Sequence, residues 1–182
     1  MERSLSKEEK RFLLSLARET LQAHLGGKPV PSADPPSGPL TEPRGAFVTL
    51  TRSGELRGCI GHVVGVAPLW CSVRENALNA ALRDPRFPPV EASELPSLDI
   101  EISALTPLRE VETPDEVVVG RHGVMIENGP FRGLLLPQVA TEYGWDRDTF
   151  LDHTCRKAGL QTGCWRRPET RIHVFSAEVF SE

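Results

Sequence analysis

Residues 56–61 bring a thiol, a guanidinium and two glycines together within six positions. Cys59 follows Arg57 by two residues and lies between Gly58 and Gly61. The thiolate is the nucleophilic form of cysteine, and a positive neighbour favours it. Residues i and i+2 of a strand share a face, so Arg57 and Cys59 are expected to point together. This 56–61 segment predicts a nucleophilic cysteine, although a buried cysteine packed as a small apolar residue explains the same pattern.

Two further side chains are candidates for proton transfer to or from such a thiol. His62 lies three residues after Cys59 and would act as a base if the chain curls there. Glu101 alternates with Ile100 and Ile102, so it faces away from the core and could act as a general base. A structural histidine and a solvated strand glutamate are the alternatives.

A second group of residues suits the binding of an anion. Arg86, in a proline-rich turn after Asp84, would join Arg57 in an anion pocket, or else serve only the turn. Gln138 lies in the first turn of a predicted helix, where free N–H groups attract negative charge, although simple capping is the alternative. We predict that five side chains converge on one cleft: Arg57, Cys59, Arg86, Glu101 and Gln138.

The glycines of the 56–61 segment are expected to let a ligand approach the backbone. Gly58→Val should then block the cleft at a modest cost in stability, provided that its backbone angles suit a branched residue. Arg57→Ala should weaken binding more than it lowers stability, because truncating an exposed arginine costs little folding energy. Gly61 is the second glycine to which the same argument applies.

The chain has 182 residues and a formal net charge of −4, with 39% hydrophobic and 25% charged residues. This ordinary globular balance argues against general nucleic-acid binding, which calls for a basic surface. No apolar run reaches the length of a membrane span, and the charged N-terminus shows no signal-peptide pattern. A cytoplasmic protein is expected.

The four cysteines, at positions 59, 71, 155 and 164, form no CxxC pair. In a reducing compartment this spacing predicts four free thiols and no structural disulfide. Cys59 and His62 could form half of a zinc site, but the second half is missing from the sequence, so no metal is predicted.

Helices and mostly antiparallel strands alternate without a regular βαβ repeat, which favours an α+β fold. Helices are expected at residues 6–25, 68–83, 137–143 and 146–158. Strands are expected at residues 47–51, 55–60, 98–106, 117–119, 124–127, 131–136 and 171–180. The proline-rich residues 28–44 predict a surface loop within one domain that spans residues 1–182.

Several stretches, in this order, resemble the AMMECR-type domain family, whose prokaryotic members are protein A of the AmmeMemoRadiSam system. They are Gly45-Ala46-Phe47-Val48-Thr49-Leu50, Leu56-Arg57-Gly58-Cys59-Ile60-Gly61, Asp84-Pro85-Arg86-Phe87-Pro88-Pro89-Val90, Ile100-Glu101-Ile102-Ser103, Gly133-Leu134-Leu135-Leu136-Pro137-Gln138-Val139-Ala140 and Gly144-Trp145. The resemblance implies a compact α+β domain with a smaller subdomain beside the main sheet. It also implies that the 56–61 segment faces the cleft between them.

The resemblance also suggests a function. It implies an enzyme, or a component of one, in a modification pathway that uses the 56–61 segment. Radical SAM and Memo-type proteins are the implied partners, and no cofactor follows for this chain. The alternative is a non-catalytic binding or scaffold module for an anionic small ligand, a peptide or a protein.

Overall fold

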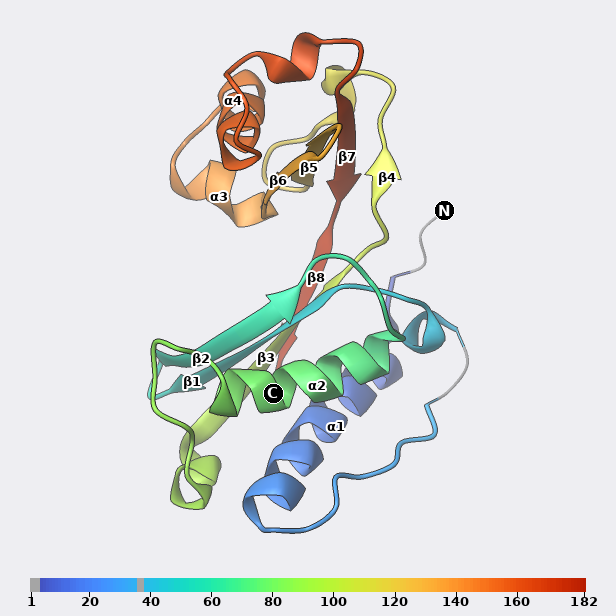
Figure 1. The fold of residues 1–182 in the computed structure, drawn as a ribbon. Helices are drawn as coiled ribbons and strands as arrows, with labels where there is room; N and C mark the ends of the chain where they lie inside the picture. Colours follow the sequence, from blue (N-terminus) through green and yellow to red (C-terminus); the bar gives the residue numbers. More distant parts are fainter. Residues whose placement is uncertain (1–3, 36–37) are drawn as a thin grey trace. The chain divides into compact units, whose positions relative to one another are not determined.

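The computed structural model describes residues 4–35 and 38–182, which divide into two compact units (Figure 1). The first unit contains the described residues up to Pro107 together with Glu178–Glu182, and the second contains Leu108–Ala177. Each unit has its own four-stranded sheet and its own helices. The predicted α+β class, with antiparallel sheets flanked by helices, is confirmed.

The sheet of the first unit has the strand order β2-β1-β3-β8. Its strands are β1 (Ala46–Arg52), β2 (Glu55–His62), β3 (Leu98–Leu105) and β8 (Ala177–Ser181). A two-residue turn joins β1 to β2, as predicted, and both turn residues, Ser53 and Gly54, have positive φ. Such turns match the twist of a hairpin, which explains the tight connection.

Helices α1 (Lys7–Leu25) and α2 (Leu69–Leu82) pack on one face of this sheet (Figure 1). The predicted capping box is present, because the Ser6 hydroxyl accepts a hydrogen bond from the Glu9 N–H and the Glu9 carboxylate accepts one from the Ser6 N–H. The core between the helices and the sheet is formed by fully buried residues that include Leu13, Leu21, Val48, Leu50, Val73, Ile100 and Ile102. Side chains of opposite parity on the strands therefore lie on the other face of the sheet.

The sheet of the second unit has the strand order β4-β7-β5-β6. Its strands are β4 (Arg109–Glu110), β5 (Gly123–Asn128), β6 (Phe131–Leu135) and β7 (Arg171–Phe175). Helices α3 (Pro137–Glu142) and α4 (Arg147–Lys157) belong to the same unit, and Asp146 caps α4 as predicted by accepting from the Thr149 N–H. The core of this unit gathers Val124, Ile126, Phe150, Leu151, Ile172 and Val174.

Short 3₁₀ helices complete the described chain: η1 (Pro39–Thr41), η2 (Ala92–Ser97), η3 (Pro114–Glu116) and η4 (Cys164–Arg166). Helix η1 lies inside the predicted surface loop 28–44, of which residues 36–37 lie outside the described residues. The remaining described residues of that loop form neither α-helix nor strand.

One strand prediction is wrong and another is wrong in part. Residues 117–119 form no strand, because Val117 ends η3 and a turn follows in which the His122 N–H donates to the Val118 carbonyl. The run 171–180 is not one strand but two, β7 and β8, which belong to different sheets. Alternation of apolar residues shows that both pieces are extended but cannot show which sheet each one joins.

The prediction of four free thiols is also wrong. Cys155 of α4 and Cys164 of η4 form a disulfide, while Cys59 and Cys71 are free. The two paired cysteines are nine positions apart. A prediction that relied on CxxC spacing therefore could not detect this pair. Gly163, with φ of 76°, turns the chain back toward α4, and its N–H donates to Asp152.

Candidate functional site

Cys59 lies on β2 and belongs to a row of three side chains that crosses the sheet. The strand register pairs Thr49 of β1 with Cys59 on one side and with Glu101 of β3 on the other. Paired residues share a face, so all three lie on the face opposite the α1 and α2 core. The Thr49 hydroxyl donates a hydrogen bond to the Cys59 sulfur at 3.2 Å. We call this set, Cys59, Thr49 and Glu101, the thiol row.

The three members of the thiol row differ in exposure. Cys59 and Thr49 are half-buried, whereas Glu101 is exposed. Neighbouring strands lie about 4.8 Å apart, so Glu101, two strands away, is about 10 Å from Cys59. Glu101 therefore shares a surface with the thiol without touching it, and a substrate would have to span the distance between them.

Arg57 does not point along the thiol row, in contrast to the prediction from strand spacing. Gly58 pairs with Leu50 and Leu56 pairs with Thr51, so Arg57 is the extra residue of a β-bulge. Only 13% of its side chain is exposed.

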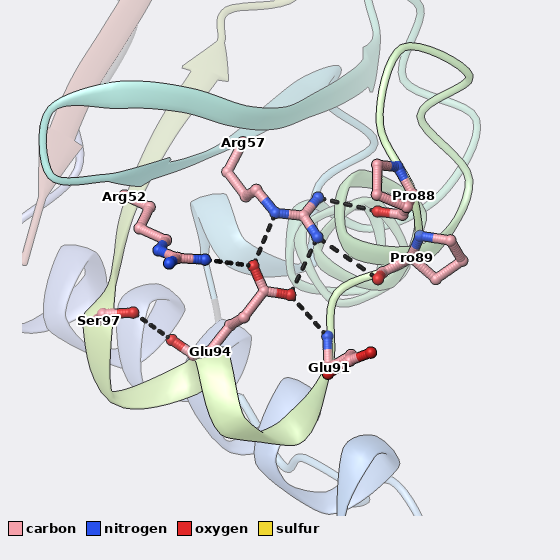
Figure 2. Close-up of polar contacts among 7 residues, drawn as sticks. All are labelled: Arg52, Arg57, Pro88, Pro89, Glu91, Glu94 and Ser97. Atoms are coloured by element: carbon pink, nitrogen blue, oxygen red, sulfur yellow. Dashed lines mark hydrogen bonds and ion pairs between the residues drawn. The ribbon is translucent and has the colours of Figure 1, made fainter.

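The Arg57 guanidinium makes four hydrogen bonds within the protein, as Figure 2 shows. It donates to both carboxylate oxygens of Glu94 at 2.9 and 3.0 Å and to the carbonyls of Pro88 and Pro89 at 2.9 and 3.4 Å. Arg52 donates to the same Glu94 carboxylate at 3.0 Å. The Arg57 hydrogen bonds, together with the Glu91 N–H and Arg52, lower the pKa of Glu94 to about 2. Arg57 thus fastens η2 and the 88–89 segment to β2.

Asp84 and Arg86 bind the outer edge of β2 beside Cys59. The Cys59 N–H donates to Asp84 Oδ2 at 2.9 Å, and Arg86 Nη2 donates to the Cys59 carbonyl at 3.4 Å. Arg86 also donates to Asp84 through Nε at 2.9 Å and Nη2 at 2.7 Å. The pair replaces a neighbouring strand at an edge that would otherwise offer free backbone groups.

The Asp84 carboxylate is almost fully buried, whereas 54% of the Arg86 side chain is exposed. Hydrogen bonds from Arg86, followed by those from the Cys59 and Arg86 N–H groups, hold the pKa of Asp84 well below its usual range despite burial. Arg86 therefore lies next to Cys59, with one side of its guanidinium bound to Asp84 and the rest exposed.

Both glycines of the 56–61 segment make room for protein atoms. A Cβ on Gly58 would lie 2.1 Å from the Ala80 carbonyl oxygen of α2. A Cβ on Gly61 would lie 2.3 Å from the Ala46 oxygen and 2.4 Å from the Phe47 ring. The predicted modest cost of Gly58→Val is therefore wrong, because the helix backbone occupies the space that a side chain needs.

His62 points to the opposite face of the sheet from Cys59, since the two are three positions apart on β2. Its Nε2 lies 3.3 Å from the Ser72 hydroxyl and its Nδ1 lies 3.3 Å from the Asn76 amide nitrogen. Both partners are buried residues of α2. The role of His62 as the base for Cys59 is thus contradicted, and the same geometry puts Cys59 and His62, the proposed half of a zinc site, on opposite faces of the sheet.

Gln138 lies on α3 in the second unit and is exposed. Its convergence with Cys59 stays a prediction. The sequence reasoning missed Thr49, the direct partner of the thiol, although Thr49 lies in a stretch that resembles the family pattern. Within residues 4–35 and 38–182, no group of three or more His, Cys, Asp or Glu side chains is placed to hold a metal ion. None of the described helices is long and apolar enough to cross a membrane.

The chain thus combines a two-unit α+β fold with a cysteine between two glycines on an edge strand, and this combination defines its class of domain. The AMMECR1 family model matches residues 14–180, which include most of both units, and the chain belongs to this family.

Relatives from archaea are similar over nearly the whole chain. A Methanothermobacter thermautotrophicus protein is 47% identical over 98% of this chain and 96% of its own length. Protein TK0174 of Thermococcus kodakarensis is 45% identical over 94% of this chain and 89% of its own length. The crystal structure of the uncharacterized protein PH0010 from Pyrococcus horikoshii matches with a TM-score of 0.79 and 40% identity, over 98% of this chain and 93% of that one.

Proposed function

We propose that this AMMECR1-domain protein is an enzyme, or a component of one, in a modification pathway, and that Cys59 is its nucleophile. The observation that carries the proposal is the hydrogen bond from the Thr49 hydroxyl to the Cys59 sulfur. A donor aimed at sulfur stabilises the charged form of a thiol more than the neutral form. The Arg86 guanidinium, paired with Asp84, also binds the Cys59 carbonyl and so helps to hold the residue in place.

The rest of the segment supports this role by holding Cys59 in position. Asp84 binds the Cys59 N–H, and Gly58 lets α2 pack directly behind the strand. A nucleophile held by buried contacts keeps a fixed geometry toward its substrate. Glu101, exposed on the same face, is the group best placed to receive or return a proton through a bound substrate.

The second candidate is a non-catalytic binding module, and one observation favours it. The polar contacts of the Cys59 side chain, within the described residues, include no acid or base, since Thr49 is its partner. An anionic ligand is a poorer fit than the sequence suggested, because Arg57 and Arg86 already bind Glu94 and Asp84. A peptide or protein bound over the thiol row fits this candidate better.

Competitive alkylation separates the two candidates. Cys71 is the internal reference, because burial raises the pKa of its thiol. With limiting iodoacetamide at neutral pH, a nucleophilic Cys59 should be modified before Cys71. Thr49→Val should slow the modification of Cys59 and Thr49→Ser should not, because serine keeps the hydroxyl. Preference for Cys71, or equal rates in both Thr49 variants, would favour the binding module.

The proposed partners, radical SAM and Memo-type proteins, rest on the family resemblance. Co-purification with each partner, using wild type and Cys59→Ser, tests them. If the Cys59→Ser variant still bound a partner but the complex no longer formed the reaction product seen with wild type, Cys59 would belong to a catalytic component. Absence of association with either protein would remove this pathway from the proposal.

A further inference from the structure

The second unit contains an open pocket of about 860 Å³ at the place where β4 and β7 stop pairing. The last backbone bond between the two segments joins the Val111 N–H to the Ile172 carbonyl at 2.9 Å. Residues 110–114 form one wall and residues 165–172 form the other. Volumes of 300–1,000 Å³ are common for ligand sites in proteins.

The lining combines apolar residues with rigid backbone. Val111, Ile172 and Trp165 are buried and contribute the apolar part. Pro114 and Pro168 also line the pocket, one from each wall. Proline fixes its own φ, so these parts of the lining lose little freedom when a ligand binds.

Helix α4 holds the 165–172 wall at three points. Asp148 accepts from Arg166 at 3.3 Å, Asp152 accepts from the Trp165 indole N–H at 2.8 Å, and the disulfide joins α4 to η4. Residues 148, 152 and 155 follow i, i+4, i+7 spacing and so share one face of the helix. The Arg166 guanidinium also stacks on the Trp165 ring, 3.8 Å from its centroid. This wall is built before any ligand arrives.

The 110–114 wall is held by Glu116. Its carboxylate accepts from the backbone N–H groups of Glu112 and Thr113 at 2.8 and 3.4 Å and from Arg109 at 2.8 Å. The backbone of this wall is therefore also fixed, and the Glu112 side chain is left exposed.

The two walls carry opposite charge and do not neutralise each other. Glu110 and Glu112 lie on one wall, and Arg166, Arg167 and Arg171 lie on the other with Glu169. Among the ion pairs within the described residues, none joins a carboxylate of the first wall to an arginine of the second. Arg167 and Arg171 are exposed; Arg171 lies across the β5–β7 pair from Glu127, whose carboxylate binds Arg132, so the charge of Arg171 interacts with Glu127 without a hydrogen bond. The pocket keeps the charges apart.

We propose that this pocket binds a short peptide that carries both a basic and an acidic side chain. The basic group would bind Glu110 and Glu112, and the acidic group would bind Arg167 and Arg171 by paired hydrogen bonds. The apolar part of the peptide would lie against Pro114 and Pro168, which line the pocket from opposite walls. A ligand of a single sign would satisfy one wall and meet unpaired like charge on the other. This site is independent of the function proposed for Cys59.

The test is an NMR titration of the full chain with capped tetrapeptides. The probe is acetyl-Lys-Ala-Ala-Glu-amide, and the comparisons are the Lys/Lys and Glu/Glu peptides of the same length. Amide shifts confined to residues 110–114 and 165–172, larger for the mixed peptide, are the expected result. No shift there, or equal shifts for all three peptides, would overturn the proposal.

Two variants and a control locate the binding. The double change Arg167→Ala and Arg171→Ala should weaken binding of the mixed peptide about tenfold, and so should the double change Glu110→Gln and Glu112→Gln. Arg121→Ala removes an exposed arginine of the same unit outside the pocket and should bind like wild type. The other amide signals report whether each variant is folded. Unchanged affinity in both folded double variants would show that the pocket is not the site.

Discussion

The Cys59 N–H donates to the buried carboxylate of Asp84 at 2.9 Å. A residue 25 positions away thus completes the hydrogen bonding of an edge strand at the cysteine itself. The same carboxylate binds Arg86, which reaches back to the Cys59 carbonyl. The stretch 84–86 and the 56–61 segment therefore form one structural unit, in which the position of the thiol depends on a charge pair.

Replacing Asp84 should loosen this unit. Asp84→Asn removes the charge that Arg86 and two backbone N–H groups share, and we expect a loss of about 2–3 kcal/mol in the free energy of unfolding. The measurement is urea unfolding at neutral pH. Asp99→Asn, at an exposed position of β3, is the matched control and should change stability little. Equal effects of the two variants would contradict the account.

The Asp84–Arg86 pair makes the free energy of unfolding depend on pH in a defined direction. The pKa of Asp84 is lower in the folded chain than its usual value of 3.8, so its stabilisation is present above that pH. As the pH falls below 3.8 toward the lowered value, the folded state loses this contribution. The stability difference between wild type and Asp84→Asn should therefore shrink in acid. A difference that stays constant with pH would contradict this linkage.

Arg57 and Arg52 offer a matched comparison, because both bind Glu94. Arg57 makes four hydrogen bonds and is 13% exposed, whereas Arg52 makes one bond to Glu94 and is 53% exposed. Arg57→Ala should cost about 2–3 kcal/mol, and Arg52→Ala less than about 1. The expectation from sequence that Arg57→Ala costs little stability assumed an exposed arginine, whereas only 13% of this side chain is exposed. The measurement is thermal and urea unfolding of both variants. If Arg57→Ala lowered the free energy of unfolding no more than Arg52→Ala, the contacts of Arg57 would be dispensable for stability.

Gly58→Ala tests the close approach of β2 to α2. Because the new Cβ would meet the Ala80 carbonyl at 2.1 Å, we expect a loss of about 3 kcal/mol or failure to fold. Gly27→Ala is the control for backbone strain without a clash, since its φ is +67° and nothing lies within 4 Å. It should cost about 1 kcal/mol. A Gly58→Ala variant as stable as wild type would mean that the helix can move aside.

The disulfide can be tested by counting thiols. Mass spectrometry under non-reducing conditions should find two free thiols, Cys59 and Cys71, and one bridge. The double change Cys155→Ala and Cys164→Ala should lower stability by about 2–3 kcal/mol. Four alkylated cysteines in protein that was never reduced would contradict the bridge.

Much of the fold followed from local sequence signals. The Ser6 capping box, the Ser53-Gly54 turn and the Asp146 cap each predicted an element boundary that the structure confirms. These signals act within a few residues, so a single sequence is enough to detect them.

The site was harder to predict because it depends on pairing between distant segments. The rule that i and i+2 share a face fails at Arg57, where a bulge adds one residue to β2. The partner of the thiol, Thr49, is ten positions away along the chain, and Asp84, 25 positions away, binds Cys59 at the outer edge of β2. No spacing in the sequence encodes these contacts.

The alkylation rate of Cys59 in the Cys71→Ser variant, folded and then unfolded in concentrated urea, tests the central claim most directly. We predict that iodoacetamide at neutral pH modifies folded Cys59 at least as fast as the unfolded chain, because the Thr49 hydroxyl holds the half-buried sulfur in a fixed position. Cys59 that is inert in the folded protein and reacts only on unfolding would contradict it and make the cysteine a packing residue.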